Sequence, residues 1–350
     1  MPVTVRSFAK INLGLGIGAL RADGFHELRT IYQTINLHDV IRVSVERGSG
    51  IEIRCEDSRV PRDESNNCYR IVELALVALE ARGRVVIEIE KRLPVQGGLG
   101  GASGNAVAAL LGLERALKKR LTGPERLRSA AAVGSDLPLF LVGGTVLGVG
   151  RGEEVFPLPD LAAIPCVVAT PEIGVSTPKA FADWDFLVAN AVELRSTRTA
   201  GGGRPHVSSG KLTTTPSSDR MVEFGRLLSS WLNSSSQSKL KTGRALSGVP
   251  VSKGRGRAET PLLDLVRTGI ENDFEKVVFP KYPELREVKS VLERSGAVYA
   301  SLSGSGSATY GLFASREAAE KAAARLRKHG IPATATTTLT RPLYWKKIFD

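Results

Sequence analysis

The chain has 350 residues, of which 42% are hydrophobic, and a formal net charge of +12. This size supports two packed domains, and without an apolar leader core or a membrane-length apolar run we expect neither secretion nor membrane insertion. Cys55, Cys68 and Cys166 are scattered without a C-x-x-C pair, which disfavours a disulfide framework or structural zinc and favours the reducing cytoplasm.

The first predicted element is a strand over residues 9–15, in which apolar residues alternate with Lys10, Asn12 and Gly14. Lys10 and Asn12 share the face opposite the core-facing side chains. An exposed strand lysine is usually only solvated, but this pair can also present a cation and an amide to a ligand. From this stretch alone, both interpretations stay open.

A turn at Asp23-Gly24 follows, and Phe25 and His26 come directly after it. Side chains just past a turn can meet a ligand. The local pattern, however, is also that of a hydrophobic staple and a surface histidine, and taken alone it favours the surface position for His26.

Three further elements precede the middle of the chain. Residues 30–36 and 41–45 predict two strands. The apolar spacing from Ile71 to Leu79 predicts a helix, with Asn66 or Asn67 as its N-cap. Strands and helices mixed in this way indicate an α+β layer structure.

A glycine-rich loop lies between a predicted strand at 85–89 and a helix that begins near Ala106. Glycine lets a backbone approach a ligand closely, and the first amides of a helix attract anions. The order strand, glycine loop, helix therefore predicts a phosphate site, and hence a nucleotide. The loop reads Pro94-Val95-Gln96-Gly97-Gly98-Leu99-Gly100-Gly101-Ala102-Ser103-Gly104.

Other interpretations of this loop are weaker. It is not a P-loop, because no Lys-Ser/Thr pair follows its last glycine. Gly98, Gly100 and Ser103 give only a near-match to the dinucleotide fingerprint. A flexible surface turn remains as the plain alternative.

One acidic residue, Asp136, lies inside the apolar stretch 134–141. An acid in such surroundings is rarely left unpaired. It either caps the short helix that opens around Pro138, or serves as a catalytic base that a cation keeps ionised. A phosphate loop, a strand lysine and a half-buried carboxylate are the parts that phosphoryl transfer requires.

Most of the positive charge belongs to one unusual segment. Residues 186–260 contain twelve Lys/Arg and four Asp/Glu, and stretches 197–218 and 233–256 are rich in Ser, Thr and Gly. Such stretches bury little and tend to be mobile. Between them, Met221–Leu232 predicts a short helix. A solvated insertion is favoured over a nucleic-acid or membrane surface.

The last part predicts helix, strand, strand, helix and strand, which suggests a small split-βαβ domain. Ser303-Gly304-Ser305-Gly306-Ser307 lies between the first two strands, at 299–302 and 309–313. The local pattern is that of an ordinary hairpin turn. Its distance along the sequence from the glycine loop does not show whether the two loops are close in space.

Several blocks, in order along the chain, resemble the GHMP small-molecule kinases. The loop at 94–104 resembles their signature, and the blocks D-G-F-H-E-L at 23–28 and G-R-G-E at 150–153 are similar to the branch that acts on a cytidyl-diphosphate derivative of methylerythritol. The other matching blocks are residues 9–13, 134–140, 143–149, 272–275 and 303–307.

This resemblance implies a two-domain α+β fold, with a ribosomal-protein-like N-terminal ATP-binding domain at 1–160. A ferredoxin-like C-terminal domain at 161–350 would carry the basic, mobile insertion at about 190–258. It also implies ATP and Mg²⁺ as cofactors, a small cytidyl-diphosphate substrate in isoprenoid precursor synthesis, and a monomer or homodimer without nucleic-acid or membrane partners.

The resemblance also implies residue roles. Asp136 matches the catalytic base, Lys10 the lysine beside it, and 94–104 the ATP phosphate loop. Asn12, Phe25, His26 and Phe181 match substrate contacts, the last three around the cytosine, so the family pattern overrides the local interpretation of His26. Ala102 and Gly104 depart from the usual Gly and Ser, which leaves Ser103 as the candidate hydroxyl for phosphate or magnesium.

Two other functions remain in competition. A GHMP kinase for homoserine, mevalonate or a sugar would share the loop, Lys10 and Asp136. A non-enzymatic nucleic-acid-binding protein is a distant third, because the charge lies in the insertion and no aromatic-basic RNA motif is present.

Overall fold

The computed structural model describes residues 1–349 except 161, 200–220, 223, 227 and 230–269. Its helices and strands are β1 (Val3–Leu20), β2 (His26–Glu46), β3 (Gly50–Cys55), α1 (Asn67–Ala78), β4 (Arg84–Glu90), α2 (Gly101–Leu117), α3 (Gly123–Val133), α4 (Leu137–Val142), β5 (Thr145–Val149), β6 (Glu154–Pro157), β7 (Pro165–Ala169), α5 (Thr177–Thr199), α8 (Glu275–Lys281), α9 (Pro283–Arg294), β8 (Tyr299–Leu302), β9 (Thr309–Leu312), α10 (Arg316–Lys328), β10 (Ala333–Thr337) and α11 (Arg341–Lys347).

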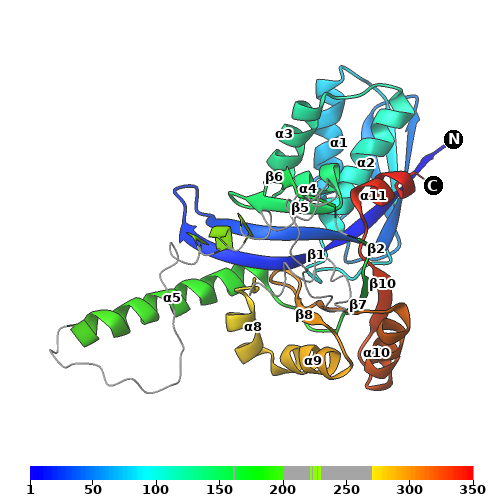
Figure 1. The fold of residues 1–350 in the computed structure, drawn as a ribbon. Coiled ribbons are helices and arrows are strands. Elements are labelled where there is room, and N and C mark those ends of the chain that lie inside the picture. Colours follow the sequence, from blue (N-terminus) through cyan, green and yellow to red (C-terminus); the bar gives the residue numbers. More distant parts are fainter. Residues whose placement is uncertain (161, 200–220, 223, 227, 230–269, 350) are drawn as a thin grey trace, which may run out of the picture.

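The two sheets confirm the expected α+β architecture. The first has the order β3-β4-β2-β5-β6, with β1 paired to β2, and α1 to α4 lie on one side of the long β1–β2 ribbon (Figure 1). The second is antiparallel in the order β10-β7-β9-β8. With α9 and α10, this order is that of a ferredoxin-like domain, as the predicted split-βαβ pattern requires.

The long strand β2 corrects one prediction, because residues 30–36 and 41–45 belong to a single strand rather than two. β1 pairs with β2 along its length, and a register shift occurs where Phe8 faces His38 and Ala9 faces Ile35. Asp39 in this irregular part is fully buried and accepts hydrogen bonds from Lys91, Arg92 and Leu93. The strand therefore continues through this buried ion pair.

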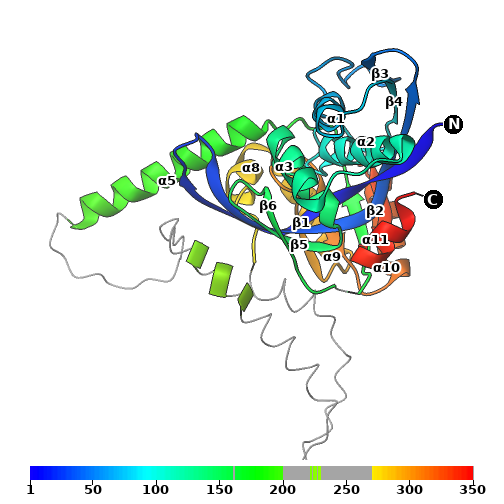
Figure 2. The same cartoon turned by 90° about the horizontal axis from the view of Figure 1, so that it is seen from above.

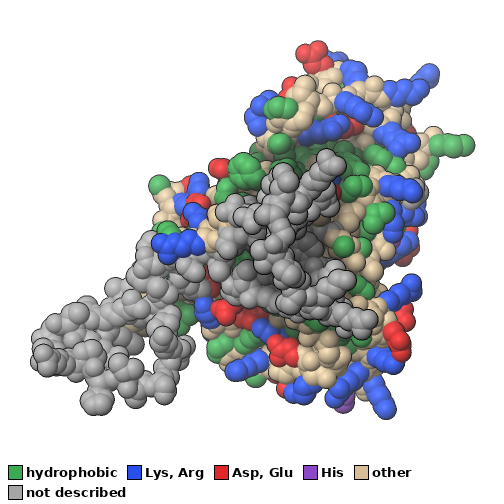
Figure 3. Space-filling view, in the orientation of Figure 1, with side chains coloured by type: hydrophobic (Ala, Val, Ile, Leu, Met, Phe, Trp, Pro, Cys, Tyr) green, Lys and Arg blue, Asp and Glu red, His purple; other side chains and the backbone are tan. Residues whose placement is uncertain are grey.

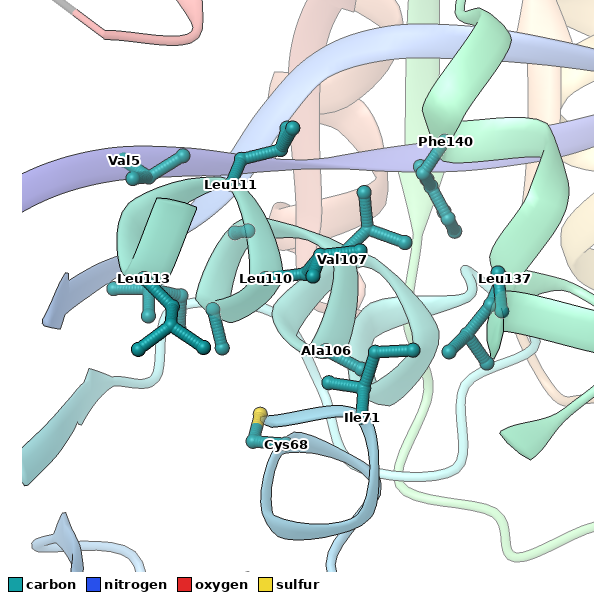
Figure 4. Packing of buried hydrophobic residues seen from close by; sticks show 14 of the residues in the cluster. Val5, Cys68, Ile71, Ala106, Val107, Leu110, Leu111, Leu113, Leu137 and Phe140 are labelled. Carbon is teal, nitrogen blue, oxygen red and sulfur yellow. The ribbon is translucent and has the colours of Figure 1, made fainter. Parts of the chain in front are cut away.

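Helix α2 is the centre of the first core. Leu111 lies against β1 beside Val5, and Ala106 faces Ile71 of α1 (Figure 4). The cap predictions for α1 are confirmed, since the Asn66 side chain accepts a hydrogen bond from the Cys68 amide. Nearly all-round burial of α2 fixes the position of its N-terminus, where the glycine loop ends.

The predicted domain boundary at residue 160 falls between β6 and β7, but the last helix does not follow it. Tyr344 and Ile348 are buried in the first core, and the Tyr344 hydroxyl donates a 2.6 Å hydrogen bond to the Phe140 carbonyl. The chain thus returns from the second sheet to close the first core, which the boundary of 161–350 did not anticipate.

The first residues of the basic insertion are helical. They belong to α5, which continues through Thr199 and extends away from both sheets (Figures 1 and 2). Within the predicted helix Met221–Leu232, the described residues between 221 and 229 are helical. Met221, Phe224 and Leu228 are buried. The rest of that predicted helix and most of the segment expected to be mobile lie outside the described residues.

Candidate active site

The glycine loop is held in place through its carbonyl groups. The Lys10 amide donates to the Leu99 carbonyl at 3.0 Å, and the Ala308 amide donates to the Gly97 carbonyl at 3.0 Å. The Ser303 hydroxyl donates to the Gly98 carbonyl at 3.0 Å. Three successive carbonyls therefore bond to the protein, which fixes the loop between β1 and the loop at 303–307.

The loop at 303–307 is therefore more than a hairpin turn. Gly98 has φ of +78°, and a Cβ on it would lie 2.2 Å from the Ser303 carbonyl oxygen. A Cβ on Gly306 would lie 2.4 Å from the Gly98 nitrogen. The two small-residue loops approach so closely that neither position has room for a side chain.

Helix α2 begins directly at the glycine loop. Its N-cap residue Gly100 is left-handed, with φ of 70°, and no side chain caps the helix. The first amides of a helix lack intrahelical acceptors and lie at the positive end of its dipole, so this terminus suits an anion. Gly104 is different: its position faces Ser7 and the Phe8 carbonyl, and it lines neither cavity at the loop.

Two cavities meet at this loop. The smaller, of about 330 Å³, is lined by loop residues 94–103 together with Lys91 and parts of segment 59–67. The larger, of about 710 Å³, contains side chains from both domains. Gly98, Gly100 and Ser103 line both. A ligand in the smaller cavity can therefore extend a phosphate chain past the loop into the larger one.

The larger cavity brings together the predicted catalytic and substrate residues. It is lined by Lys10, Asn12, Phe25, His26, Asp136 and Phe181. They come from β1, β2, the turn between them, the start of α4, and α5. Residues that were separate in the sequence therefore face one space.

Lys10 is 3% exposed, and its ammonium group is held by hydrogen bonding. Nζ donates to Asn12 Oδ1 at 2.7 Å, and Asn12 Nδ2 donates to Thr30 Oγ1 at 2.7 Å. Thr30 Oγ1 in turn donates to the Gly14 carbonyl at 2.8 Å. This series of hydrogen bonds fixes the orientation of the Asn12 amide. Its oxygen accepts from Lys10, and its nitrogen donates to Thr30.

Asp136 occupies the N-cap position of α4, but its side chain makes no capping hydrogen bond, so the capping interpretation is wrong. Its Oδ2 lies 3.5 Å from Lys10 Nζ, and its Oδ1 accepts a 3.0 Å hydrogen bond from the Tyr32 hydroxyl. The carboxylate is 34% exposed, toward the larger cavity. The Asp136 carboxylate thus lies beside a cation, accepts one hydrogen bond, and is otherwise open to the larger cavity.

The aromatic residues pair differently from the expected arrangement. Phe181 stacks on His26, with ring centroids 5.1 Å apart and planes at 6°. Phe25 is 51% exposed, and the Arg151 guanidinium lies 4.9 Å from its ring centroid. The three rings all line the larger cavity.

His26 has a polar neighbour at each ring nitrogen. Nδ1 lies 3.2 Å from the Gly18 carbonyl oxygen, and Nε2 lies 3.2 Å from Asp185 Oδ1 on α5. These contacts fix the ring in the plane on which Phe181 stacks. His26 is buried, so the surface position favoured by the local pattern is wrong.

Sequence reasoning missed Tyr32, Arg151 and Asp185. Arg151 lay in the recognised G-R-G-E block, so that block was its signal. Tyr32 faces Asn12 across the β1–β2 pair, which only the strand register reveals. Asp185 lies beyond the recognised stretch at 176–181, and its contact with His26 depends on how α5 packs.

The described residues offer few ligands for a Mg²⁺ ion. Among the described residues there is no cluster of three or more His, Cys, Asp or Glu that could hold a metal. Mg²⁺ in phosphoryl transfer is held mainly by phosphates and water, with one or two protein ligands. The hydroxyl of Ser103, which lines both cavities, fits that role.

Comparisons with known proteins show the family of the chain. The family models for the N terminal domain and the C terminal region of GHMP kinases match residues 66–144 and 259–332. A 4-diphosphocytidyl-2-C-methyl-D-erythritol kinase of Solibacter usitatus is 36% identical over 90% of this chain and 82% of its own length. That of Acaryochloris marina is 32% identical over 93% of this chain and 91% of its own length.

Solved structures give the same result. A crystal structure of 4-(cytidine 5'-diphospho)-2C-methyl-D-erythritol kinase is 30% identical, with a TM-score of 0.64, and the match covers 96% of this chain and 98% of that one. A homoserine kinase from Cytophaga hutchinsonii has a TM-score of 0.65 at 19% identity, over 97% and 95% of the two chains. The second likeness is one of fold alone.

Proposed function

This chain belongs to the 4-diphosphocytidyl-2-C-methyl-D-erythritol kinases of the GHMP superfamily, and we propose that it phosphorylates the 2-hydroxyl of that compound with ATP, in isoprenoid precursor synthesis. It is an ATP-dependent small-molecule kinase. The observation that carries the substrate proposal is the larger cavity, where Lys10 and Asp136 face the glycine loop at one end and Phe25, His26 and Phe181 provide aromatic surface.

In this proposal the smaller cavity holds the adenosine part of ATP. The phosphate chain follows the loop, where the first amides of α2 and the helix dipole compensate its charge. Gly98, Gly100 and Ser103 border both cavities, so the γ-phosphate reaches the side of Lys10 and Asp136.

Asp136 serves as the general base. Its carboxylate accepts the proton of the substrate 2-hydroxyl while that oxygen bonds to the γ-phosphorus, and the bond to the β,γ-bridging oxygen breaks to release ADP. Lys10, held by Asn12, keeps a positive charge beside the carboxylate and offsets charge that develops on the transferred group. Positioning and electrostatics supply most of the catalysis.

The nucleotide site would also take Mg²⁺, which when bound would neutralise part of the phosphate charge. Ser103 is the residue that we propose to contact it or a phosphate, because its place at the start of α2 borders both cavities. Loss of this hydroxyl is therefore expected to raise the Mg²⁺ concentration needed for half-maximal rate.

The aromatic part of the cavity would bind the cytosine. Phe25 and Phe181 offer ring faces for stacking, and His26, with its Asp185 partner, offers polar groups to the base edge. The Arg151 guanidinium lies over one face of the Phe25 ring, so a base that stacks on that face would displace it.

A nucleic-acid-binding role has less support. On the face shown in Figure 3, the lysine and arginine side chains outside the grey residues are scattered along the edges and interspersed with acidic ones. Many of the described arginines are paired with carboxylates, including Arg42 with Glu90 and Arg126 with Glu114. Nucleic-acid binding favours a continuous basic surface.

A coupled assay of ADP release with the cytidyl substrate tests the proposal, with homoserine, mevalonate and sugars as competing acceptors. We expect turnover only with the cytidyl compound, and a fall of about a thousandfold or more in kcat for Asp136→Asn. Glu317→Gln on α10 is the matched carboxylate-to-amide control. Faster turnover of another acceptor would show that the substrate is that compound. An unchanged kcat in Asp136→Asn would show that Asp136 is not the general base.

A further inference from the structure

Tyr32 is a buried residue on β2 that lies directly behind the proposed catalytic base. Its side chain is 2% exposed, and its hydroxyl donates a 3.0 Å hydrogen bond to Asp136 Oδ1. Lys10 Nζ lies 5.7 Å from the Tyr32 ring centroid and 3.5 Å from the other carboxylate oxygen, Oδ2. The two oxygens of Asp136 therefore have different partners.

The glycines that follow Gly143-Gly144 make room for this tyrosine. A Cβ on Gly148 would lie 2.5 Å from Tyr32 Cε2, and a Cβ on Gly152 would lie 2.5 Å from the Tyr32 hydroxyl oxygen. Gly152 also has φ of +100°, which side chains rarely adopt. The glycine spacing in this block thus fits the Tyr32 ring and fixes its hydroxyl against Asp136.

The hydroxyl is a permanent donor. Burial, followed by the nearby charges of Asp136 and Glu153, raises the pKa of Tyr32 well above its usual value. The phenol therefore stays protonated wherever the enzyme is active, and its one proton is committed to Oδ1. Arg151 and His26 line the same cavity, but Arg151 pairs with Glu153, and His26 contacts the Gly18 carbonyl and Asp185 rather than Asp136.

We propose that Tyr32 is a positioning residue that holds the Asp136 carboxylate so that Oδ2 receives the proton of the acceptor hydroxyl. This inference rests on the proposed kinase function. With Oδ1 occupied by the phenol, Oδ2 is the oxygen that lies beside Lys10 and remains open to the acceptor. The proton moves from the acceptor to Oδ2, and Tyr32 neither gains nor loses a proton.

The decisive variant is Tyr32→Phe, which keeps the ring between Gly148 and Gly152 and removes only the hydroxyl. Hydrogen bonds to charged groups are worth enough to predict a fall of about 10- to 100-fold in kcat. The KM values for ATP and acceptor are expected to stay within about twofold, because the hydroxyl contacts neither ligand in this proposal. A higher acceptor KM with an unchanged kcat would instead make Tyr32 a substrate contact and overturn the inference.

A double-mutant cycle separates positioning from general structure. If Tyr32 acts through Asp136, Tyr32→Phe has no further effect in an Asp136→Asn background, measured with radiolabelled ATP over long incubations. The same fractional loss in both backgrounds would contradict the proposal. Tyr344→Phe is the matched control, since it removes another buried phenol hydrogen bond, to the Phe140 carbonyl, and is expected to leave kcat unchanged.

Two measurements keep the inference testable apart from turnover. In spectra of protein with isotope-labelled aspartate, the Asp136 carboxyl resonance, assigned by its loss in Asp136→Asn, is expected to shift in Tyr32→Phe and not in Tyr344→Phe. An unchanged resonance would overturn the proposed hydrogen bond even if the wild type had another substrate. If Tyr32→Phe does not fold, Gly152→Ala tests the same contact by displacing the retained hydroxyl, and an unchanged kcat in it would count against the inference.

Discussion

The hydroxyl of Ser303 donates a 3.0 Å hydrogen bond to the carbonyl of Gly98, and this contact joins the two small-residue loops that border the site. The loops come from different domains of the chain. The geometry of the phosphate loop therefore depends on residues far away in sequence as well as on its own glycines.

Gly98→Ala tests this contact between loops. Its Cβ would lie 2.2 Å from the Ser303 carbonyl oxygen, in a backbone with φ of +78°, so the loops must separate. We expect a loss of about 1–3 kcal/mol in the free energy of unfolding and weaker ATP binding, measured by urea unfolding and nucleotide titration. Gly174→Ala is the control, because its Cβ would meet nothing within 4 Å. Equal behaviour of the two variants would show that the loops do not need their close approach.

Lys10→Met separates catalysis from stability. The substitution keeps most of the buried apolar stem and removes the charge beside Asp136. We expect kcat to fall about 100- to 1000-fold, while the free energy of unfolding falls by only about 1–2 kcal/mol, because the carboxylate left behind, Asp136, is 34% exposed and keeps its hydrogen bond from Tyr32. Lys119→Met, at an exposed position, is the control. Parallel losses of activity and stability would make Lys10 mainly structural.

Phe181→Ala and Phe25→Ala test the aromatic part of the cavity. We expect each to weaken binding of cytidine diphosphate about tenfold, because each removes a ring face, and to leave ATP binding unchanged. Calorimetric titration measures both ligands. Phe156→Ala, on β6, removes a ring that is 52% exposed and lies outside the cavity, so it serves as the control. Unchanged cytidine diphosphate affinity in both cavity variants would place the base elsewhere.

Asp39→Ala tests a buried ion pair beside the nucleotide cavity. Asp39 is fully buried and accepts hydrogen bonds from Lys91 Nζ at 2.5 Å and from the Arg92 and Leu93 amides at 2.7 Å. Its loss leaves the Lys91 charge and two amides without this partner, so we expect about 3–5 kcal/mol lower stability in urea unfolding. Asp63→Ala, at an exposed turn, is the control and is expected to leave the urea midpoint of unfolding unchanged. A similar midpoint in both variants would contradict the burial argument.

The cysteines are expected to be unreactive in the folded protein. All three are buried, and burial raises the pKa of the Cys68 thiol to about 12 and that of Cys166 above its usual range. Because the thiolate is the reactive form, a chromogenic disulfide reagent at neutral pH should modify the thiols slowly, and all three rapidly after guanidinium unfolding. Rapid modification of the native protein would show that a core containing a cysteine opens, the first for Cys55 and Cys68 or the second for Cys166.

At Asp136, the local sequence predicts the surroundings of the residue but not its contacts. The apolar stretch around it and the start of a helix could be predicted, but the sequence offered capping and catalysis as equal explanations. The structure excludes capping, and the contacts with Tyr32 and Lys10, from two strands distant in sequence, support the proposed catalytic role. Likewise, the alternating patterns at 30–36 and 41–45 predicted two strands, whereas pairing with β1 and the buried ion pair of Asp39 keep β2 continuous.

The sequence by itself determined the glycine loop between β4 and α2, the cap of α1, the ferredoxin-like order of the second domain and, through its blocks, the family. Those features depend on periodicity and on residues close together in the chain. The tertiary structure decided that the loop at 303–307 supports the glycine loop, that α11 closes the first core, and that Tyr32 holds Asp136. Such contacts depend on strand register and on how helices pack across the two sheets, which no local spacing specifies.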